Sequence, residues 1–426
     1  MSYVGKEVEW YGDEDERVLG AVLLYFEDQD WTWAVLGRDE KGLFRAINVG
    51  ASIETREKAR VLLHEKLIHH AQTGESVFPQ HENDAKKNEL LQPVVDESRL
   101  HPHFKTLIKS THFSSAREII RELAHAFVDV DGNYCKDFQT TGFNARLWEL
   151  YLFALLYEQR FSMFREFKRP DFCVARDDFR VGIEAVTVNP TSGERPPSPQ
   201  SQHELDILRH EYMPIKFGSA LYSKLQKRYW ELPHMSDVPL ILAVHDFCAD
   251  DSMTWSAPAI NDYLYGLRAS WFQDASGKLH ITESPVERHT WKEKTIPSGF
   301  FNQPDAERVS AVLFSNSATL SKFNRMGKLA GFGSDRVLMT RIGIRQNFDP
   351  NASEGIRFAE EVKPGQYSES WAEGLRLFLN PRAVHPIAPP LFTGCAFHFL
   401  RDGRRVAMLP DLFVHTSRTL VIALQD

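Results

Sequence analysis

Apolar and polar residues alternate near the start of the chain, and helical spacing replaces this alternation soon afterwards. The segments WTWAVLGRD and LFRAINVG flank Glu-Lys-Gly, which is typical of two strands joined by a glycine-containing turn. The stretch ETREKARVLLHEKLIHHAQTG then repeats apolar residues at helical spacing and ends at a glycine. The pattern in residues 1–75 therefore predicts a small domain of strands followed by a helix. The polar, weakly periodic residues 76–100 predict a linker.

Residues 101–250 predict a second domain. The segment FNARLWELYLFALLYEQRF (143–161) is apolar almost all round, as a helix buried in a core should be. Three short strand candidates follow it, namely FREFK, DFCVAR and VGIEAVTV. After a segment rich in Pro and Ser come a helix in IKFGSALYSKLQKRYWEL and a buried strand in VPLILAVHDF. The predicted order is helix, three strands, helix, strand.

Residues 251–426 mix helical and strand patterns, including a hairpin on Asp-Gly in AFHFLRDGRRVAML. They predict a C-terminal α/β accessory region. We therefore expect a mixed α/β (α+β) protein in which a central core has one flanking region on each side.

Two acidic residues of the central region are predicted to lie opposite each other. If Asp177 and Asp178 form the centre of an even-length turn, cross-strand partners have numbers that sum to 355, and Asp171 pairs with Glu184. Direct partners hold their Cβ atoms roughly 4.5–5.5 Å apart on one face of a sheet. Carboxylates at that distance repel unless a positive group lies between them, and Mg²⁺ or Mn²⁺ suits such oxygen ligands. An odd-length turn would shift the register by one residue and separate the pair.

A third acid, Glu149, lies in the apolar segment LWELYLFALLY. Burial of a glutamate there costs several kcal/mol unless the carboxylate is paired or bound to metal. It either joins the two other acids at a metal site or forms an ion pair with Arg146, three residues earlier on the same helix.

Glu149 on a helix, Pro170-Asp171 at the start of one strand and Glu184 in IEAV on the next resemble the PD-(D/E)xK nuclease superfamily. The resemblance covers residues 143–247 and implies a restriction-endonuclease-like αβββαβ core. It implies that Asp171 and Glu184 ligate the metal and that Glu149 holds a metal-bound water or a second ion. The metal lowers the pKa of a bound water and stabilises charge on the scissile phosphate. The sequence departs from the family at Val186, where lysine is usual.

We expect the missing lysine to come from the helix that follows the Glu184 strand. Lys224 borders the apolar face that Leu221 and Leu225 mark, so its stem can run over that face to the metal site. Lys216 is the second candidate, and Lys227 points further round the helix. The alternative is that all three lysines only keep an amphipathic helix soluble.

Composition excludes several classes of protein. A formal net charge of −8 argues against a protein that coats nucleic acid nonspecifically, although a local basic groove stays compatible with it. No apolar run approaches the roughly 20 residues that span a bilayer. The start of the chain has no signal-peptide pattern and the four cysteines form no CxxC pair, so we expect a cytoplasmic protein.

Other catalytic motifs are incomplete or absent. HEKLIHH has its second histidine one position too late for a zinc-protease helix, and DVDGNYCKD (129–137) lacks the closing glutamate of a calcium loop. The sequence contains neither a phosphate-binding glycine-lysine loop nor GxSxG.

The sequence favours a Mg²⁺- or Mn²⁺-dependent nuclease, with DNA as a likelier substrate than RNA and a role in antiviral defence or DNA processing. The flanking regions would bind nucleic acid, a partner protein or a second copy of the chain. One alternative is an inactive module that keeps the fold and binds nucleic acid. Another is a structural protein in which salt bridges neutralise all three acids.

Overall fold

The computed structural model describes residues 5–26, 29–40, 42–79, 90–127, 132–164, 166–191, 198–249, 252–388 and 391–424. The chain divides into two compact units. One holds residues 1–89 with 124–126, and the other holds residues 90–123 and 127–426. None of the helices in the described ranges is both long enough and apolar enough to cross a membrane.

The first unit contains the predicted strands and helix. Its four antiparallel strands are β1 (Gly5–Gly12), β2 (Val18–Tyr25), β3 (Trp31–Arg38) and β4 (Phe44–Ile53), and its helix is α1 (Arg56–Thr73). The apolar face of α1, including Leu63, packs on Val18 and Val35 of the sheet. The helix ends at Gly74, whose φ of 72° is the left-handed conformation that glycine adopts without strain.

Four helices open the second unit: α2 (Pro102–Lys109), α3 (Ser114–Ala126), α4 (Tyr134–Gln139) and α5 (Phe143–Glu158). Residues 80–89 of the predicted linker, and residues 129–131 at the start of the stretch considered as a calcium loop, lie outside the described residues. Ten of the sixteen residues of α5 are buried, including every residue from Leu150 to Leu156, in agreement with its apolar sequence.

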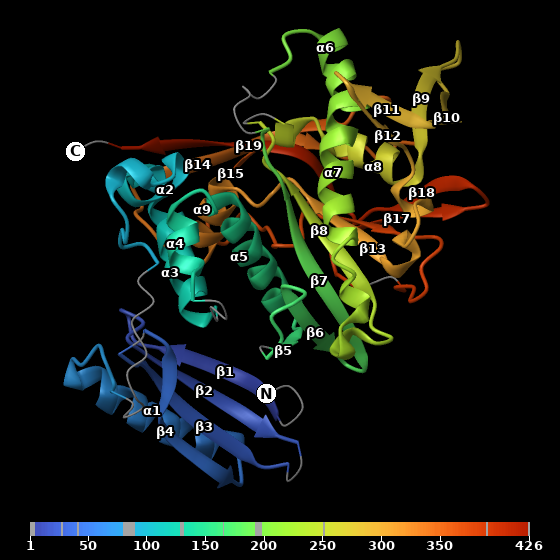
Figure 1. Ribbon diagram of the computed structural model, residues 1–426. Helices are drawn as coiled ribbons and strands as arrows, with labels where there is room; N and C mark the ends of the chain where they lie inside the picture. Colours follow the sequence, from blue (N-terminus) through green and yellow to red (C-terminus); the bar gives the residue numbers. More distant parts are fainter. Residues whose placement is uncertain are drawn as a thin grey trace. The chain divides into compact units, whose positions relative to one another are not determined.

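The centre of this unit is an eight-stranded mixed sheet (Figure 1). In spatial order its strands are β18 (Arg404–Met408), β17 (Ala396–Arg401), β16 (Arg376–Leu379), β13 (Ala311–Ser315), β8 (Leu240–Asp246), β7 (Phe179–Val188), β6 (Phe172–Arg176) and β5 (Ser162–Phe164). Strands β7, β8 and β13 run parallel to one another, and every residue of β8 is buried. A strand buried on both faces needs the uninterrupted apolar run that LILAV supplies.

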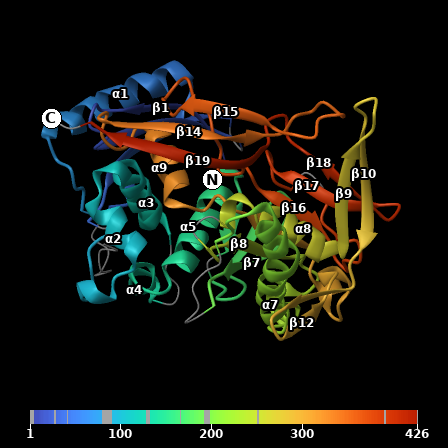
Figure 2. The ribbon, with the colours of Figure 1, turned by 90° about the horizontal axis from the view of Figure 1, so that it is seen from above.

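Helices cover both faces of this sheet. The helix after β7 comprises α6 (Gln202–Ile207), a π-helical turn (Leu208–Tyr212) and α7 (Met213–Leu225). Helices α5 and α7 lie on opposite sides of β7 and β8 (Figures 1 and 2). On the α5 side, the indole Nε1 of Trp148 donates a hydrogen bond to the backbone oxygen of Ala243 in β8, at 2.8 Å. The elements thus follow the predicted order of helix, three strands, helix, strand.

The remaining elements follow residue 250. They are α8 (Ala257–Tyr265), α9 (Leu320–Leu329), the hairpins β9 (Leu267–Gln273) with β10 (Leu279–Pro285) and β11 (Arg288–Trp291) with β12 (Lys294–Pro297), and a three-stranded sheet of β14 (Val337–Arg345), β15 (Ile356–Glu361) and β19 (Val414–Ala423). The predicted Asp-Gly hairpin is β17–β18, with positive φ at Asp402 and Gly403. The boundary that we expected near residue 250 falls inside the eight-stranded sheet, because β13 pairs directly with β8.

Candidate active site

The hairpin of β6 and β7 has the predicted register. Phe172 pairs with Ile183 and Arg176 with Phe179, so partner numbers sum to 355 around a two-residue turn. Asp171 lies one residue before β6. Its Oδ2 accepts a hydrogen bond from the backbone N–H of Ala185 at 2.7 Å, and its own N–H donates to Oε2 of Glu184 at 3.3 Å. The two acids are therefore held beside each other, as the even-length turn predicts.

These acids lie where one edge of β7 is open. β6 pairs with β7 only as far as Ile183, whereas β8 pairs with it to Val188. In the described part of the chain, residues 184–188 thus have a strand neighbour on one side alone. A pocket of about 250 Å³ lies at this edge, and α5, β7 and α7 all contribute to its lining. Glu149, Asp171 and Lys224 are among the lining residues, so three of the four predicted site residues face one space.

The fourth residue, Glu184, joins the site through Lys224. The Nζ of Lys224 donates to Oε1 of Glu184 at 2.5 Å. The carboxylate of Glu184 is almost fully buried, while Lys224 keeps 30% of its side chain exposed. Leu221 and Leu225 are buried, and they anchor the face of α7 that Lys224 borders. The lysine on this helix therefore reaches the strand acid.

Glu149 has the ion pair that we considered as the alternative. Both of its carboxylate oxygens accept from Nη1 of Arg146, at 3.1 and 2.8 Å. Nη2 of the same arginine donates to Asp137 at 2.8 Å. Glu149 also lines the pocket with Asp171, so it is both an ion-pair partner and a wall of the site. The two expectations for Glu149 are compatible in this geometry.

The negative charges of the site act on one another. Asp171 is an exposed residue, yet desolvation by the protein around its carboxyl group, and then the charges of Glu184 and Glu149, raise its pKa to about 8. Burial also raises the pKa of Glu149, and Arg146 opposes this rise. An added positive charge at the site would lower the pKa of Asp171 again.

Tyr229 is a neighbour of the site that the sequence did not indicate. It follows α7 and is buried. Burial, followed by the charge and hydrogen bond of Glu184, raises the pKa of its hydroxyl. Tyr229 therefore stays protonated and can donate to Glu184. The segment KRYW carries no pattern that would mark a tyrosine for this role, because the contact depends on how the chain turns after the helix.

The site offers two adjacent carboxylates to a cation. The described residues contain no group of three or more His, Cys, Asp or Glu side chains arranged to hold a metal ion. Mg²⁺ commonly binds proteins through only one or two carboxylates and keeps several waters. Asp171 and Glu184 fit this mode, because they are adjacent oxygen ligands and because desolvation, followed by the charges of Glu184 and Glu149, raises the pKa of Asp171.

A larger hollow of about 790 Å³ adjoins the pocket, because Thr187 and Ala220 line both. Its lining includes three lysines and one acid, namely Lys216, Lys292, Lys294 and Glu293. Lys216 donates to Oγ1 of Thr191 at 3.2 Å and Lys294 to Oγ of Ser219 at 2.6 Å. The surface beside the carboxylates is therefore locally basic, despite the acidic balance of the whole chain.

Comparison of the chain with protein-family models, curated proteins and solved structures found no match.

Proposed function

We propose that the protein is a metal-dependent nuclease that hydrolyses phosphodiester bonds. The observation that carries the proposal is the grouping of Asp171, Glu184 and Lys224 at the open edge of β7. Two acids that would repel each other are held side by side, and an ammonium group approaches one of them. This is the arrangement expected of a site for a cation and a phosphate group.

Asp171 and Glu184 would hold Mg²⁺ or Mn²⁺. When bound, the metal supplies a water of lowered pKa and stabilises charge on the phosphate. Lys224 offsets the negative charge that develops on the phosphoryl oxygens and helps to orient the attacking water. Glu149, which lines the same pocket, would accept a hydrogen bond from that water or hold a second ion.

The buried position of Val186 explains why the lysine of this site comes from a helix. Val186 is 1% exposed and belongs to the same apolar cluster as Phe217 and Leu221 of α7. A lysine there would displace an apolar side chain from the interface of strand and helix. Lys224 instead lies at the edge of this interface, with its ammonium on the carboxylate of Glu184.

The basic hollow beside the pocket suits the backbone of a nucleic acid. Lys216, Lys292 and Lys294 would contact phosphates on one side of the scissile bond, because the hollow and the pocket share part of their lining. We favour DNA as the substrate. The outcome of the assay below distinguishes this nuclease from a nucleic-acid-binding module without turnover.

The test is a cleavage assay with Mg²⁺ or Mn²⁺ on single- and double-stranded DNA and RNA. Asp171→Ala and Glu184→Ala should abolish cleavage, while Asp178→Ala, in the exposed turn of the same hairpin, should retain it. Binding of nucleic acid without cleavage by the unmodified protein would favour the binding module. Wild-type cleavage by either site variant would refute the assignment of the site.

A further inference from the structure

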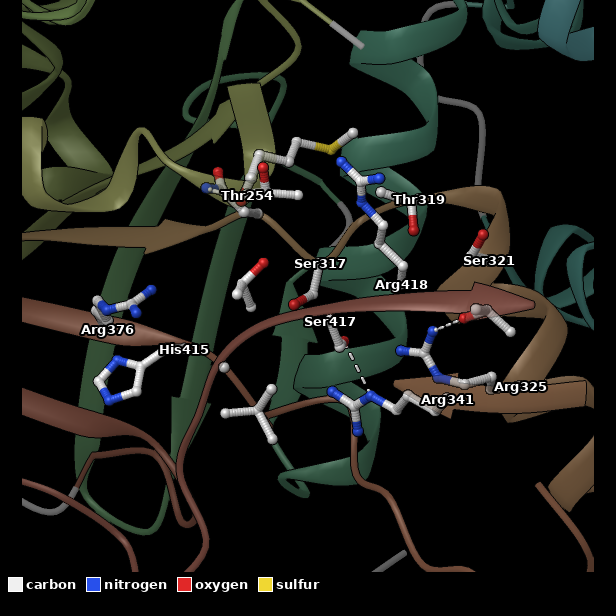
Figure 3. A pocket seen from close by; sticks show the side chains of 16 residues that line it. Thr254, Ser317, Thr319, Ser321, Arg325, Arg341, Arg376, His415, Ser417 and Arg418 are labelled. Carbon is white, nitrogen blue, oxygen red and sulfur yellow. Dashed lines mark hydrogen bonds between the residues drawn. The ribbon is translucent and has the colours of Figure 1, made fainter. Parts of the chain in front are cut away.

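A second pocket, of about 370 Å³, lies in the C-terminal part of the sheet and is separate from the carboxylate site. Its walls come from the loop after β13, the start of α9, and strands β14, β16 and β19. No residue that lines it also lines the carboxylate pocket. Four arginines face it, namely Arg325, Arg341, Arg376 and Arg418, together with several serines and threonines (Figure 3).

Acidic residues neutralise only part of this positive charge. Glu369 accepts from Lys322 and Arg325 at 2.7 Å, and Arg341 lies 3.4 Å from the same carboxylate. Arg341 also pairs with Glu373 at 2.5 Å. Three buried cations, Lys322, Arg325 and Arg341, therefore share these two carboxylates, and Arg376 adds a further positive charge.

Arg376 is the most informative residue of the pocket. It is 8% exposed, and in the described part of the chain no hydrogen bond or ion pair engages its guanidinium. Its guanidinium carbon lies 4.9 Å from the centre of the Phe413 ring. Burial lowers its pKa to about 10, so the group still carries a full charge near neutral pH. Figure 3 shows this guanidinium pointing into the pocket. Burial of a charge without a partner costs several kcal/mol, which an anionic ligand would offset.

Hydroxyl groups complete the lining. Oγ of Ser417 accepts from Nε of Arg341 at 2.9 Å, and Oγ1 of Thr419 accepts from Arg325 at 2.6 Å. Because each oxygen accepts from an arginine, its own O–H can donate to a ligand. Thr319 and Ser321, at the start of α9, also line the pocket. The amino end of this ten-residue helix adds partial positive charge.

We propose that this pocket binds the phosphate group of a small ligand, with Arg376 as its principal charged contact. A phosphate presents several acceptor oxygens to an arginine fork and to surrounding hydroxyls, whereas a carboxylate presents only two. The excess of cations over acids also favours a dianion. The volume lies in the range of small-molecule sites, which leaves room for more than the phosphate group.

Calorimetry and thermal unfolding of the full chain test the proposal, with inorganic phosphate and adenosine 5′-monophosphate as probes and chloride at matched ionic strength as the reference. Both probes should bind and raise the unfolding temperature. Arg376→Met should weaken binding by about a hundredfold, since it removes charge-assisted hydrogen bonds. In chloride this variant should be at least as stable as the parent, because it removes an unpaired buried charge.

Arg357→Met, on exposed β15, is the matched control and should bind both probes like the parent. Loss of probe binding in Lys216→Met but not in Arg376→Met would place the probes in the basic hollow and overturn the proposal. If Arg376→Met does not fold, Arg418→Met replaces it and should weaken binding at least tenfold. Tighter binding of the nucleotide than of phosphate would assign the rest of the pocket to the body of the ligand. No binding of either probe, or equal binding by the arginine variants and the parent, would overturn the proposal.

Discussion

Lys224 of α7 donates a 2.5 Å hydrogen bond to Glu184 of β7, although the two residues are 40 positions apart in the chain. The pair connects the helix to the strand at the edge where Asp171 accepts from the backbone of Ala185. A change at Lys224 should therefore affect both the stability of the fold, because Glu184 loses its partner, and the proposed cleavage reaction.

Lys224→Met should lower the cleavage rate by at least a hundredfold, or about 3 kcal/mol of transition-state stabilisation. Without metal it should also destabilise the fold by about 1–2 kcal/mol, because buried Glu184 loses its partner. Single-turnover kinetics and denaturant unfolding measure the two effects. Lys227→Met, at an exposed position after α7, is the control and should change neither. Unchanged cleavage by Lys224→Met would exclude this lysine from the mechanism, and Lys216 would then be the next candidate.

Asp171→Asn should change how stability depends on pH in the absence of metal. The folded-state pKa of about 8 lies above the ordinary value of 3.8, so Asp171 favours the folded state most below pH 4. This contribution is lost as pH rises toward 8, because the unfolded chain then releases a proton that the folded chain retains. The asparagine keeps an oxygen for the N–H of Ala185 but cannot ionise. Between pH 4 and 9, the free energy of unfolding should therefore fall less steeply with pH for the variant than for the parent. Identical slopes would contradict the prediction.

Divalent cations should bind with an affinity that rises with pH up to about 8, because ligation by Asp171 requires loss of its proton. Mg²⁺ and Mn²⁺ should support cleavage, while Ca²⁺ should bind with little turnover, since its looser geometry positions water poorly. Calorimetry in buffers of different ionisation enthalpy measures the released proton. Absence of binding at millimolar metal, even with nucleic acid present, would oppose an active nuclease.

Arg146→Met should destabilise the protein by about 2 kcal/mol, because Glu149 keeps only 13% of its side chain exposed and would lose its cation. Adding Glu149→Gln should restore most of that loss, since the neutral amide needs no counter-charge. A double-mutant cycle by denaturant unfolding gives the coupling. Additive losses would show that the two side chains do not stabilise each other. Glu149→Gln alone should slow cleavage, which tests its role at the pocket separately.

Glu369→Gln should be among the most destabilising single changes, at about 3–5 kcal/mol, because Lys322 and Arg325 are buried and depend on this carboxylate. Glu360→Gln is the matched control. Glu360 is 44% exposed and its 3.4 Å pair with Arg345 should contribute little. Similar unfolding midpoints for the two variants would disprove the central importance of Glu369.

Local patterns predicted the parts of the site that depend on short-range geometry. The turn at Asp177-Asp178 determines the register that brings Asp171 to Glu184, and helical periodicity placed Lys224 beside Leu221 and Leu225. The periodicity of a segment does not indicate which distant strands will pair. The pairing of β13 with β8 and the position of Tyr229 depend on packing between segments far apart in the chain.

The arginine pocket shows the same limit. Arg341, Arg376 and Arg418 come from three strands of two sheets, and no spacing in the sequence relates them. Each alone looks like an ordinary surface cation. Only the three-dimensional structure reveals that Arg376 is buried and that no hydrogen bond or ion pair among the described residues engages its guanidinium.

The pairing of β13 with β8 has a consequence for biosynthesis. A ribosome adds residues from the amino end, so the β6–β7 hairpin and β8 emerge well before Ala311–Ser315 of β13. During that interval, the N–H and C=O groups along the β13 side of β8 have no strand partner. This edge can therefore pair with another nascent chain. Charged or proline residues usually protect such an edge, but LILAV has neither. Slow translation between residues 246 and 311 should therefore lower the yield of soluble protein, and chaperones that shield exposed strands should restore it.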